Sequence, residues 1–347
     1  MLAAAASPGT LAPPVLDAVA LTLPALAAVG IAVALDLAIA EPPTRIHPVA
    51  WFGSIVGRTD RPWARPRLVG VAVAGVLPIA AAALAGGLVA VAAGIGSLFA
   101  ALVAGVALFS TVSLRMLLDE TARVVELTQT SPDAARESIR ALVGRDTADL
   151  SPAALRSAAV ESAAENLADG FVAPLGGFLV GATVGLGLAV GGAEAGVPAD
   201  AGAALSLGVA GAVWVKAVNT LDSMLGYRTK PVGWASARLD DGVMFLPARA
   251  TAVCLAVAAG SLGALRAAGR WARVPASPNS GWPMATAAAA LDVRLEKPRA
   301  YVLAPDAAPP TVADAERAVR LVGVAGGVAV AGAAGWLVTL AGVIAWA

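Results

Sequence analysis

Three carboxylates stand at the entrance of a long apolar segment, in the stretch AVESAAENLADGFVAPLGG over residues 159–177. Glu161, Glu165 and Asp169 are spaced four residues apart, so on a helix they would line one face, where like charges repel each other. Ionisable groups near lipid are costly and rare, which favours a functional role. Hard oxygen ligands suit Mg²⁺, an ion that often accompanies phosphate-bearing substrates. A solvated helix face, or salt bridges to nearby arginines, is the alternative interpretation.

A second polar stripe lies in VKAVNTLDSMLGYR, residues 215–228. Lys216, Asn219, Asp222 and Ser223 fall at positions i, i+3, i+6 and i+7, which lie on one side of a helix. A lysine that extends its ammonium group to the membrane surface would explain Lys216 alone, but not the polar side chains beside it. Arg238, Asp240 and Asp241 follow in a stretch that we expect to be a loop.

Two further stretches contain groups that could bind or transfer protons. The turn ASPNSGWPM, residues 276–284, offers amides and hydroxyls at Ser277, Asn279 and Ser280 that could cradle a phosphate, although most such turns only connect elements. In DLAIAEPPTRIHPVAWFG, residues 36–53, His47 is a candidate acid or base, although a lone histidine is more often structural. Neither GxxxxGK[ST] nor GxGxxG before a helix occurs, so neither standard phosphate loop would hold a nucleotide.

The composition identifies the elements that must position these groups. The chain has 347 residues, of which 58% are hydrophobic and 14% charged, whereas soluble domains carry about 25% charged residues. It is therefore an integral membrane protein. The net charge of zero gives no indication of a nucleic-acid partner, and single residues of cysteine and histidine exclude a disulfide framework and multi-histidine metal chemistry. No basic region precedes the first apolar stretch, so we expect no cleaved secretory signal there.

The apolar runs predict an all-α, polytopic helical bundle in one membrane-embedded domain over 1–347, because a spanning helix needs about 20 apolar residues. The expected spans are 16–40, two helices within 68–114, 171–193, 202–219, 246–265 and 321–347. Ser151 and Pro152 are typical of a helix start, and the segment 115–170 is expected to be helical.

Basic residues concentrate in four polar segments, 41–67, 115–170, 220–242 and 266–320. Basic loops remain on the cytoplasmic side, which predicts a cytoplasmic site in a multi-pass protein of the cell membrane. Simple crossing parity would place 266–320 on the other side if 246–265 crossed fully. We therefore expect 246–265 to be re-entrant or interfacial, or to contain a hairpin.

Five stretches in this order closely resemble one family, the membrane-bound adenosylcobinamide-phosphate synthases of cobalamin biosynthesis, also called the CobD/CbiB family. They extend from about residue 36 to 295, and they are EPPTRIHPVAWFG, GRDTADLSPAALRSAAVESAAENLADGFVAPLGG, KAVNTLDSMLGYR, GWASARLDD and SPNSGWPMA. The resemblance implies a ligase that joins the corrinoid adenosylcobyric acid to (R)-1-aminopropan-2-ol phosphate, or to ethanolamine phosphate, with consumption of ATP in the presence of Mg²⁺.

Our expected residue roles combine this implied reaction with the polar stretches. The candidate catalytic residues are Glu161, Glu165, Lys216, Asp222 and Arg238. The candidate substrate-binding residues are Asn166, Asn219, Ser223, Tyr227, Ser277, Asn279, Ser280 and His47. The candidate Mg²⁺ ligands are Glu161, Glu165, Asp169, Asp240 and Asp241.

The chain departs from the expected family pattern at several positions, which leaves amine specificity open. Ala40 stands where a glycine is usual before the acid of the first motif, and Ala276, Met244 and Val302 also replace expected residues. A transporter for a cation or corrinoid, and a non-catalytic scaffold for other cobalamin enzymes, are the alternative functions. Besides the lipid bilayer, a second copy of the chain or other membrane proteins of the pathway remain open as partners.

Overall fold

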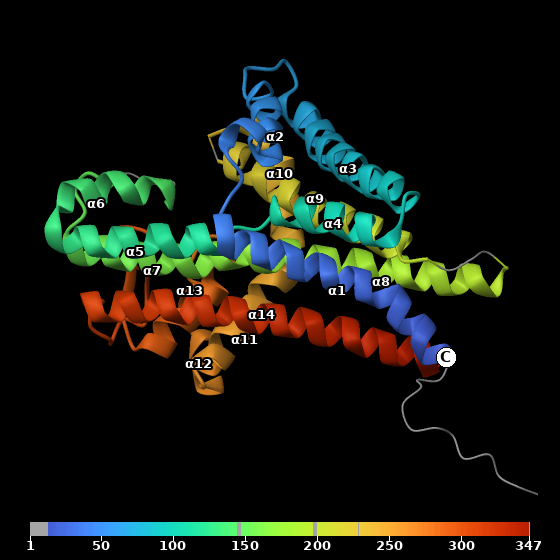
Figure 1. The fold of residues 1–347 in the computed structure, drawn as a ribbon. Coiled ribbons are helices and arrows are strands. Elements are labelled where there is room, and N and C mark those ends of the chain that lie inside the picture. The colour runs from blue at the N-terminus through green and yellow to red at the C-terminus, as the bar shows by residue number, and fades with distance from the viewer. Residues whose placement is uncertain (1–12, 144–146, 197–199, 228, 347) are drawn as a thin grey trace, which may run out of the picture.

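The computed structural model describes residues 13–143, 147–196, 200–227 and 229–346, so the N-terminal stretch considered for a signal lies mostly outside the described residues. As the sequence predicts, the fold is an all-α polytopic membrane bundle (Figure 1). Its longer helices are α1 (Pro13–Ile39), α3 (Pro66–Ala93), α4 (Ser97–Phe109), α5 (Leu114–Thr130), α7 (Pro152–Leu167), α8 (Ala173–Glu194), α9 (Gly202–Leu225) and α14 (Val312–Trp346).

Shorter elements connect these helices. The short α-helices are α2 (Pro48–Gly57), α6 (Pro132–Ser138), α10 (Trp234–Val243), α11 (Phe245–Ala258), α12 (Leu262–Ala268) and α13 (Gly281–Leu291). Three 3₁₀ turns are η1 (Thr44–Ile46), η2 (Ile139–Ala141) and η4 (Pro231–Gly233), and a π-helical turn, η3 (Ala168–Val172), joins α7 to α8. An antiparallel hairpin of β1 (Leu295–Lys297) and β2 (Tyr301–Leu303) was not predicted from the sequence.

Six helical segments in the described part of the chain are long and apolar enough to cross a membrane: α1, α3, α4 with α5, α7 with α8, α9, and α14. In the region 68–114, where two helices were predicted, the structure has α3 and α4. The uncertain segment 246–265 forms α11 and the start of α12, and the α10–α11 pair is bent by 47°, as in a broken span or a re-entrant loop. The prediction of a helical 115–170 is confirmed by α5, α6 and α7.

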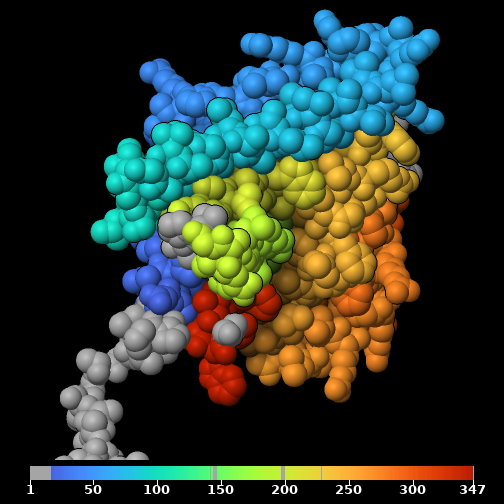
Figure 2. Space-filling model, turned by 90° about the vertical axis from the view of Figure 1, so that its right-hand side faces the viewer, coloured from blue at the N-terminus to red at the C-terminus, as the bar shows by residue number. Residues whose placement is uncertain are grey.

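The polar and apolar ends of the bundle separate clearly. In Figure 1, α5, α6 and α7 extend toward one end of the molecule, whereas α1, α4, α8 and α14 extend toward the other. Figure 2 views the latter end, where α3 and α4 cover one side of the bundle. Their outward side chains, including Leu84, Leu88, Leu98 and Leu102, are exposed and apolar, as expected of a surface in contact with lipid.

Close packing of α8 against α9 forms the centre of the bundle. Gly177, Gly181 and Gly185 repeat every four residues on α8, and each places its bare Cα against backbone of α9. Small residues at this spacing let two membrane helices approach closely. This contact fixes where η3, at the start of α8, lies relative to the polar end of α9.

Reciprocal capping joins α1 to α5. The Asp36 carboxylate, which is only 1% exposed, accepts the Leu114 N–H at 3.0 Å and the Arg115 N–H at 3.1 Å, at the first turn of α5. Arg115 in turn donates to the carbonyls of Leu37 and Ala38 at the end of α1. Each helix end thus has partners for groups that the helix itself leaves unpaired.

We expect Asp36→Ala to lower the stability by about 1–3 kcal/mol, because it leaves buried N–H donors without an acceptor. Thermal unfolding of the detergent-purified protein would show this as a lower Tm. Asp17→Ala, at an exposed position near the other end of α1, is the matched control. Equal Tm values for the two variants would contradict the capping role.

Candidate functional site

Seven polar side chains from four separate parts of the chain gather at the polar ends of α8 and α9. This group, called here the lysine cluster, consists of Glu41, Asp169, Lys216, Asn219, Asp222, Asp240 and Asp241. The segment after α1 supplies the first, η3 the second, α9 the next three and α10 the last two. The expectation of a loop at Arg238, Asp240 and Asp241 was therefore wrong, because these residues lie in helix α10. The fold therefore brings together residues that are up to two hundred positions apart in the sequence.

The π-helical turn η3 explains why Asp169 belongs to this cluster. A π turn adds one residue to a helical turn and changes the direction of the side chains that follow. Asp169 lies in η3 and interacts with Lys216, Asn219 and Asp222. Glu161 and Glu165, which precede the turn on α7, instead line a separate pocket. The single carboxylate stripe predicted for these three acids is thus divided between two places.

Lys216 is the cation at the centre of the lysine cluster. It is half-buried, and the carboxylates of Glu41 and Asp169 lie within range of its charge. Asn219, one helical turn further along α9, faces the carboxylates of Asp169 and Asp240. The predicted stripe of Lys216, Asn219 and Asp222 therefore points into one site. Ser223, which was predicted with it, is exposed and donates to the Asn219 carbonyl of its own helix.

Asp240 has an unsatisfied oxygen. Its Oδ1 is buried and has no hydrogen-bond partner among the described residues, while Asp169, Asp222 and Asp241 add negative charge around it. A buried carboxylate that is surrounded by other carboxylates must be neutralised by a proton or by a cation. Within the same described residues, no three metal-binding side chains lie close enough to hold an ion by themselves. Mg²⁺, however, is usually held by one or two carboxylates together with water and substrate phosphates, and these donors fit that arrangement.

The SPNSG turn is fastened to the edge of the lysine cluster. Asn279 donates through Nδ2 to the Asp241 carbonyl at 2.8 Å and accepts through Oδ1 from Arg249 at 2.9 Å. Arg249 also lies over the rings of Phe245 and Trp282, at 3.6 and 5.3 Å from their centroids. Arg249 was not among the predicted site residues, although a charge inside an apolar segment is a recognisable signal.

The predicted phosphate cradle has its amides already engaged. The Ser277 hydroxyl accepts the N–H groups of Asn279 and Ser280, at 3.2 and 3.3 Å, which closes the turn. The arrangement positions the Asn279 side chain between α10 and α11. Arg238, another predicted residue, is largely exposed and forms an ion pair with Asp241 at 3.3 Å. It therefore stands at the rim of the lysine cluster.

His47 and Glu41 approach Lys216 from the segment after α1. Burial lowers the pKa of the His47 imidazole, and the charge of Lys216 lowers it further, so the neutral form is favoured. Its Nδ1 accepts the Val49 N–H at 3.2 Å and so caps α2. Burial raises the pKa of the Glu41 carboxyl, and the Lys216 charge opposes that shift. The sequence indicated His47 as the candidate, whereas Glu41, whose carboxylate also lies within range of the Lys216 charge, was not predicted as a site residue.

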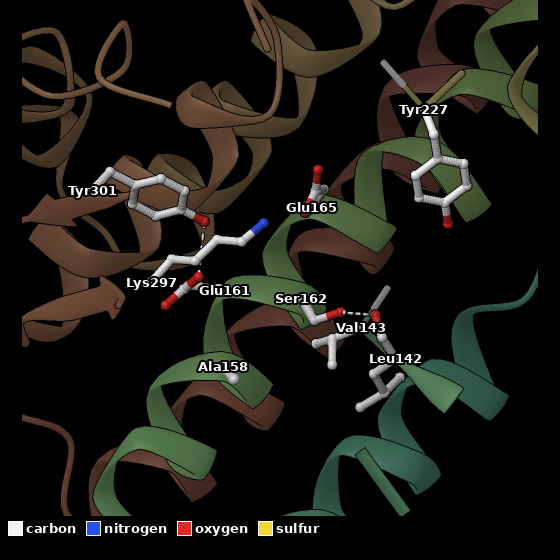
Figure 3. Close-up of a pocket in the computed structure, with 9 residues that line it drawn as sticks. All are labelled: Leu142, Val143, Ala158, Glu161, Ser162, Glu165, Tyr227, Lys297 and Tyr301. Carbon is white, nitrogen blue, oxygen red and sulfur yellow. Dashed lines mark hydrogen bonds between the residues drawn. The ribbon is translucent and has the colours of Figure 1, made fainter. Parts of the chain in front are cut away.

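A second polar site, called here the tyrosine pocket, lies beside α7 (Figure 3). It is a cavity of about 230 Å³ lined by Leu142, Val143, Ala158, Glu161, Ser162, Glu165, Tyr227, Lys297 and Tyr301. Glu161 is 3% exposed and accepts from Tyr301 Oη at 2.8 Å and from Ser157 Oγ at 3.0 Å. The Ser157 hydroxyl also accepts the Glu296 N–H, which fastens the β-hairpin to α7.

Two other predicted residues lie next to this pocket. Asn166 donates to the carbonyl and hydroxyl of Ser162, at 3.0 and 2.9 Å, and so supports the pocket wall from within α7. Tyr227 lines the pocket with a half-exposed ring. The predicted catalytic and metal-binding residues, apart from Arg238 at the rim, thus divide between the lysine cluster and the tyrosine pocket.

Comparison with known proteins places this arrangement in a family. The family model described as CobD/Cbib protein matches residues 29–322, which include every residue of both sites. The chain belongs to the CobD/CbiB family. This confirms the resemblance seen in the five sequence stretches, and it makes the chain a member of a family of cobalamin biosynthesis proteins.

Individual relatives agree with the family match. A protein of Methanothrix thermoacetophila named probable cobalamin biosynthesis protein CobD is 33% identical, over 84% of this chain and 90% of that protein. Cobalamin biosynthesis protein CobD of Rhodobacter capsulatus is 36% identical over 78% of this chain and 82% of its own. The protein of the same name in Klebsiella pneumoniae is 34% identical, over 77% and 81% respectively. No solved structure matches the chain.

Proposed function

We propose that this CobD/CbiB family member is an ATP-dependent ligase of the cell membrane. It joins a propionate carboxylate of adenosylcobyric acid to the amine of an aminoalcohol phosphate, and the product is adenosylcobinamide phosphate. The observation that carries this proposal is the lysine cluster, because it brings a half-buried cation and several carboxylates from four of the family's sequence stretches into one site.

The proposed reaction requires both the positive charge of a cation and the negative charges of carboxylates at the site. A carboxylate does not react with an amine at neutral pH, so ATP must first transfer its γ-phosphoryl group to the carboxylate oxygen and leave as ADP. The amine nitrogen then attacks the acyl carbon, phosphate departs, and the ammonium group loses two protons in all as the neutral amide forms. Negative charge develops on the phosphoryl oxygens and on the acyl oxygen, and positioned cations and donors stabilise it.

The residues of the lysine cluster can serve these steps. Lys216 can stabilise phosphoryl or acyl oxygens, and the negative charges of Glu41 and Asp169 favour its charged ammonium form. Mg²⁺ would be held by Asp240 with Asp222 or Asp169, and when bound it would neutralise phosphate charge. Asn219 orients the carboxylates that it faces. The same carboxylates provide acceptors for the protons that the ammonium group releases.

The position of the cluster suits substrates of different kinds. It lies at the polar ends of α8 and α9, whose remaining length is apolar. A large corrinoid can therefore lie against the membrane surface while ATP and the amine enter from water. The basic segments around the site favour the cytoplasmic side, where ATP is present.

A coupling assay on the detergent-purified chain tests the proposal. Adenosylcobyric acid, aminopropanol phosphate, ATP and Mg²⁺ should give adenosylcobinamide phosphate by mass detection, with one phosphate released per amide. Omission of any single component should abolish both product and phosphate release. Glu194→Gln, an exposed change at the far end of α8, should react like the wild type.

Two results would contradict the ligase. One is well-folded protein that gives no product with either aminopropanol phosphate or ethanolamine phosphate, as a scaffold would. The other is ATP consumption that does not depend on both the corrinoid and the amine, as a transporter or a simple ATPase would show.

A further inference from the structure

A basic region without acids follows the bend between α10 and α11. The stretch 242–291 contains no aspartate and no glutamate, and its basic residues are Arg249, Arg266, Arg270 and Arg273. In Figure 2 the gold and orange parts of the chain, which include α11 and α12, form the surface on the right of the molecule. Positive charge that no acid of the same stretch balances favours an anionic partner.

Arg249 is held in a fixed position at the start of this region. Its Nη1 donates to the Phe245 carbonyl at 2.8 Å and to Asn279 Oδ1 at 2.9 Å, and its Nη2 donates to the Pro278 carbonyl at 3.4 Å. A guanidinium group has five N–H donors, so Nε and one hydrogen of Nη2 have no partner among the described residues. An arginine can bond phosphate oxygens with such remaining donors.

The positive charge of Arg249 has no carboxylate to balance it. In the part of the chain that the structure describes, no acid forms an ion pair with Arg249 or Arg273 within 4.0 Å. Arg273, which is exposed, instead adds a second positive charge within range of Arg249. Two guanidinium groups repel each other, and a phosphate group bound by both would replace this repulsion with attraction.

An exposed apolar stripe continues from Arg249 along α11. Val253 and Val257 follow at intervals of four residues, which places them on the same side of the helix, and they are 44% and 48% exposed. The rise from 249 to 257 is about 12 Å, close to the roughly 15 Å of hydrocarbon in one leaflet. A nucleotide has no apolar tail for such a stripe, whereas a phospholipid carries acyl chains beside its phosphate.

We propose that Arg249 and Arg273, together with Val253 and Val257, bind an anionic phospholipid of the surrounding leaflet. The guanidinium groups lie at the lipid phosphate, and the two valines lie along an acyl chain. A lipid with net negative charge is favoured over a zwitterionic one, because the stretch 242–291 has no acid for a choline group.

This lipid site is connected to the lysine cluster through Asn279. The Asn279 side chain accepts from Arg249 and donates to the Asp241 carbonyl at 2.8 Å. A bound lipid therefore holds the SPNSG turn against the bend between α10 and α11, beside the cluster.

Lipid titration of the detergent-purified full chain tests the site without turnover. Native mass spectrometry should show that dioleoyl phosphatidylglycerol binds at least about fivefold more tightly than dioleoyl phosphatidylcholine, whose ammonium group cancels the phosphate charge. Glycerophosphoglycerol, which is the same headgroup without acyl chains, should bind far more weakly, because it leaves the apolar stripe exposed to water.

Arg273→Gln removes one charge at an exposed position, and it should weaken phosphatidylglycerol binding about fivefold. Arg249→Gln should weaken binding about tenfold or more, because charge-assisted hydrogen bonds are lost. Since Arg249 also supports the SPNSG turn, the Arg273→Gln result decides the matter if Arg249→Gln does not fold. Arg123→Gln is the matched control, because Arg123 is an exposed arginine on another helix, α5, and pairs with Glu120 at 3.9 Å. It should bind phosphatidylglycerol like the wild type.

Three results would overturn the proposal. The first is equal binding of the two lipids by the wild type, and the second is unchanged phosphatidylglycerol binding in Arg273→Gln or in folded Arg249→Gln. The third uses inorganic tripolyphosphate as the probe for a soluble ligand. If tripolyphosphate bound more tightly than phosphatidylglycerol and depended on both arginines, the site would belong to a free phosphate compound such as a nucleotide. These measurements contain no turnover, so their outcome does not depend on the proposed ligase function.

Discussion

We expect Lys216→Met to lower the kcat of amide formation by about 10²–10³-fold, the usual cost of removing one group that stabilises developing negative charge. Lys216 is the cation on which Glu41 and Asp169 converge, and the proposed chemistry builds negative charge on phosphoryl and acyl oxygens. Methionine keeps the length and apolar body of the side chain but carries no charge. The measurement is initial-rate product formation at saturating ATP, corrinoid and amine phosphate.

The same substitution also affects folding, which the experiment must separate from catalysis. Removal of the lysine leaves the nearby carboxylates of Glu41 and Asp169 without a compensating positive charge, so the Tm should fall as well. Lys216→Arg keeps the charge and so should fold, but its planar guanidinium cannot occupy the same point as an ammonium group. We expect it to retain the wild-type Tm while its kcat falls at least about tenfold.

Lys230→Met is the control for loss of a positive charge. Lys230 pairs with Asp60 at 2.7 Å, and both side chains are partly exposed, so the pair contributes about 0–1 kcal/mol. The kcat of the Lys230→Met variant should match that of the wild type. Wild-type turnover in well-folded Lys216→Met or Lys216→Arg would remove Lys216 from the reaction and leave the cluster with a structural role only.

The sequence predicts the fold class and the polar segments well, because both depend on local patterns. Apolar runs such as 68–114 determine spans by length alone, and the start of α7 follows from Ser151, which accepts the Ala154 N–H as predicted. The stripe of Lys216, Asn219 and Asp222 was also predictable, because it lies within one regular helix. In each of these cases the helix is regular, so the helical spacing of the residues in the sequence predicts their arrangement in the structure.

The site was predicted less well where the periodicity breaks. The spacing of Glu161, Glu165 and Asp169 gives one stripe only on an uninterrupted α-helix, whereas Asp169 lies in the π turn η3. Asp169 interacts with residues of the lysine cluster, and Glu161 and Glu165 line the tyrosine pocket. No residue in ADGFV marks a π turn by its type alone. Lys297 and Tyr301 were missed for another reason, since their position depends on a hairpin that docks on α7 through Ser157, a contact 139 residues apart in the sequence.

The bend between α10 and α11 likewise required tertiary information. The sequence indicated an unusual segment at 246–265 because basic residues follow it, and it offered three alternatives. The structure shows two helices at 47° to each other, with Arg249 bonded to Asn279 near the bend. The conflict between charge distribution and crossing parity was therefore a sound signal of irregular structure, although it did not specify the geometry.

Gly181→Ala should destabilise the protein by about 1–3 kcal/mol, the typical cost of overpacking a close contact. A methyl group on Gly181 would overlap the Leu207 carbonyl, which belongs to the backbone of α9 and cannot move without the helix. The sign of this effect is informative, because alanine in place of glycine within a helix is otherwise favourable by about 1 kcal/mol.

Gly187→Ala supplies the comparison on the same helix. Gly187 is exposed, with no atom near the position of an added Cβ, so this variant should have a Tm equal to or above that of the wild type. The two changes add the same methyl group to α8 and differ only in whether α9 lies against it. Thermal unfolding in one detergent would give both values.

The packing of α8 against α9 also determines the relative positions of the residues in the lysine cluster. The glycine row of α8 sets the distance between α8 and α9. Asp169 lies in η3, which leads into α8, and Lys216 and Asn219 lie near the end of α9. A wider spacing would separate Asp169 from its partners, so Gly181→Ala should lower kcat by about tenfold even below its Tm, as small misplacements of catalytic groups do. A Gly181→Ala protein with unchanged Tm and unchanged kcat would show that this contact does not set the spacing of α8 and α9. Unchanged Tm with lowered kcat would place the effect on the alignment of the lysine cluster alone.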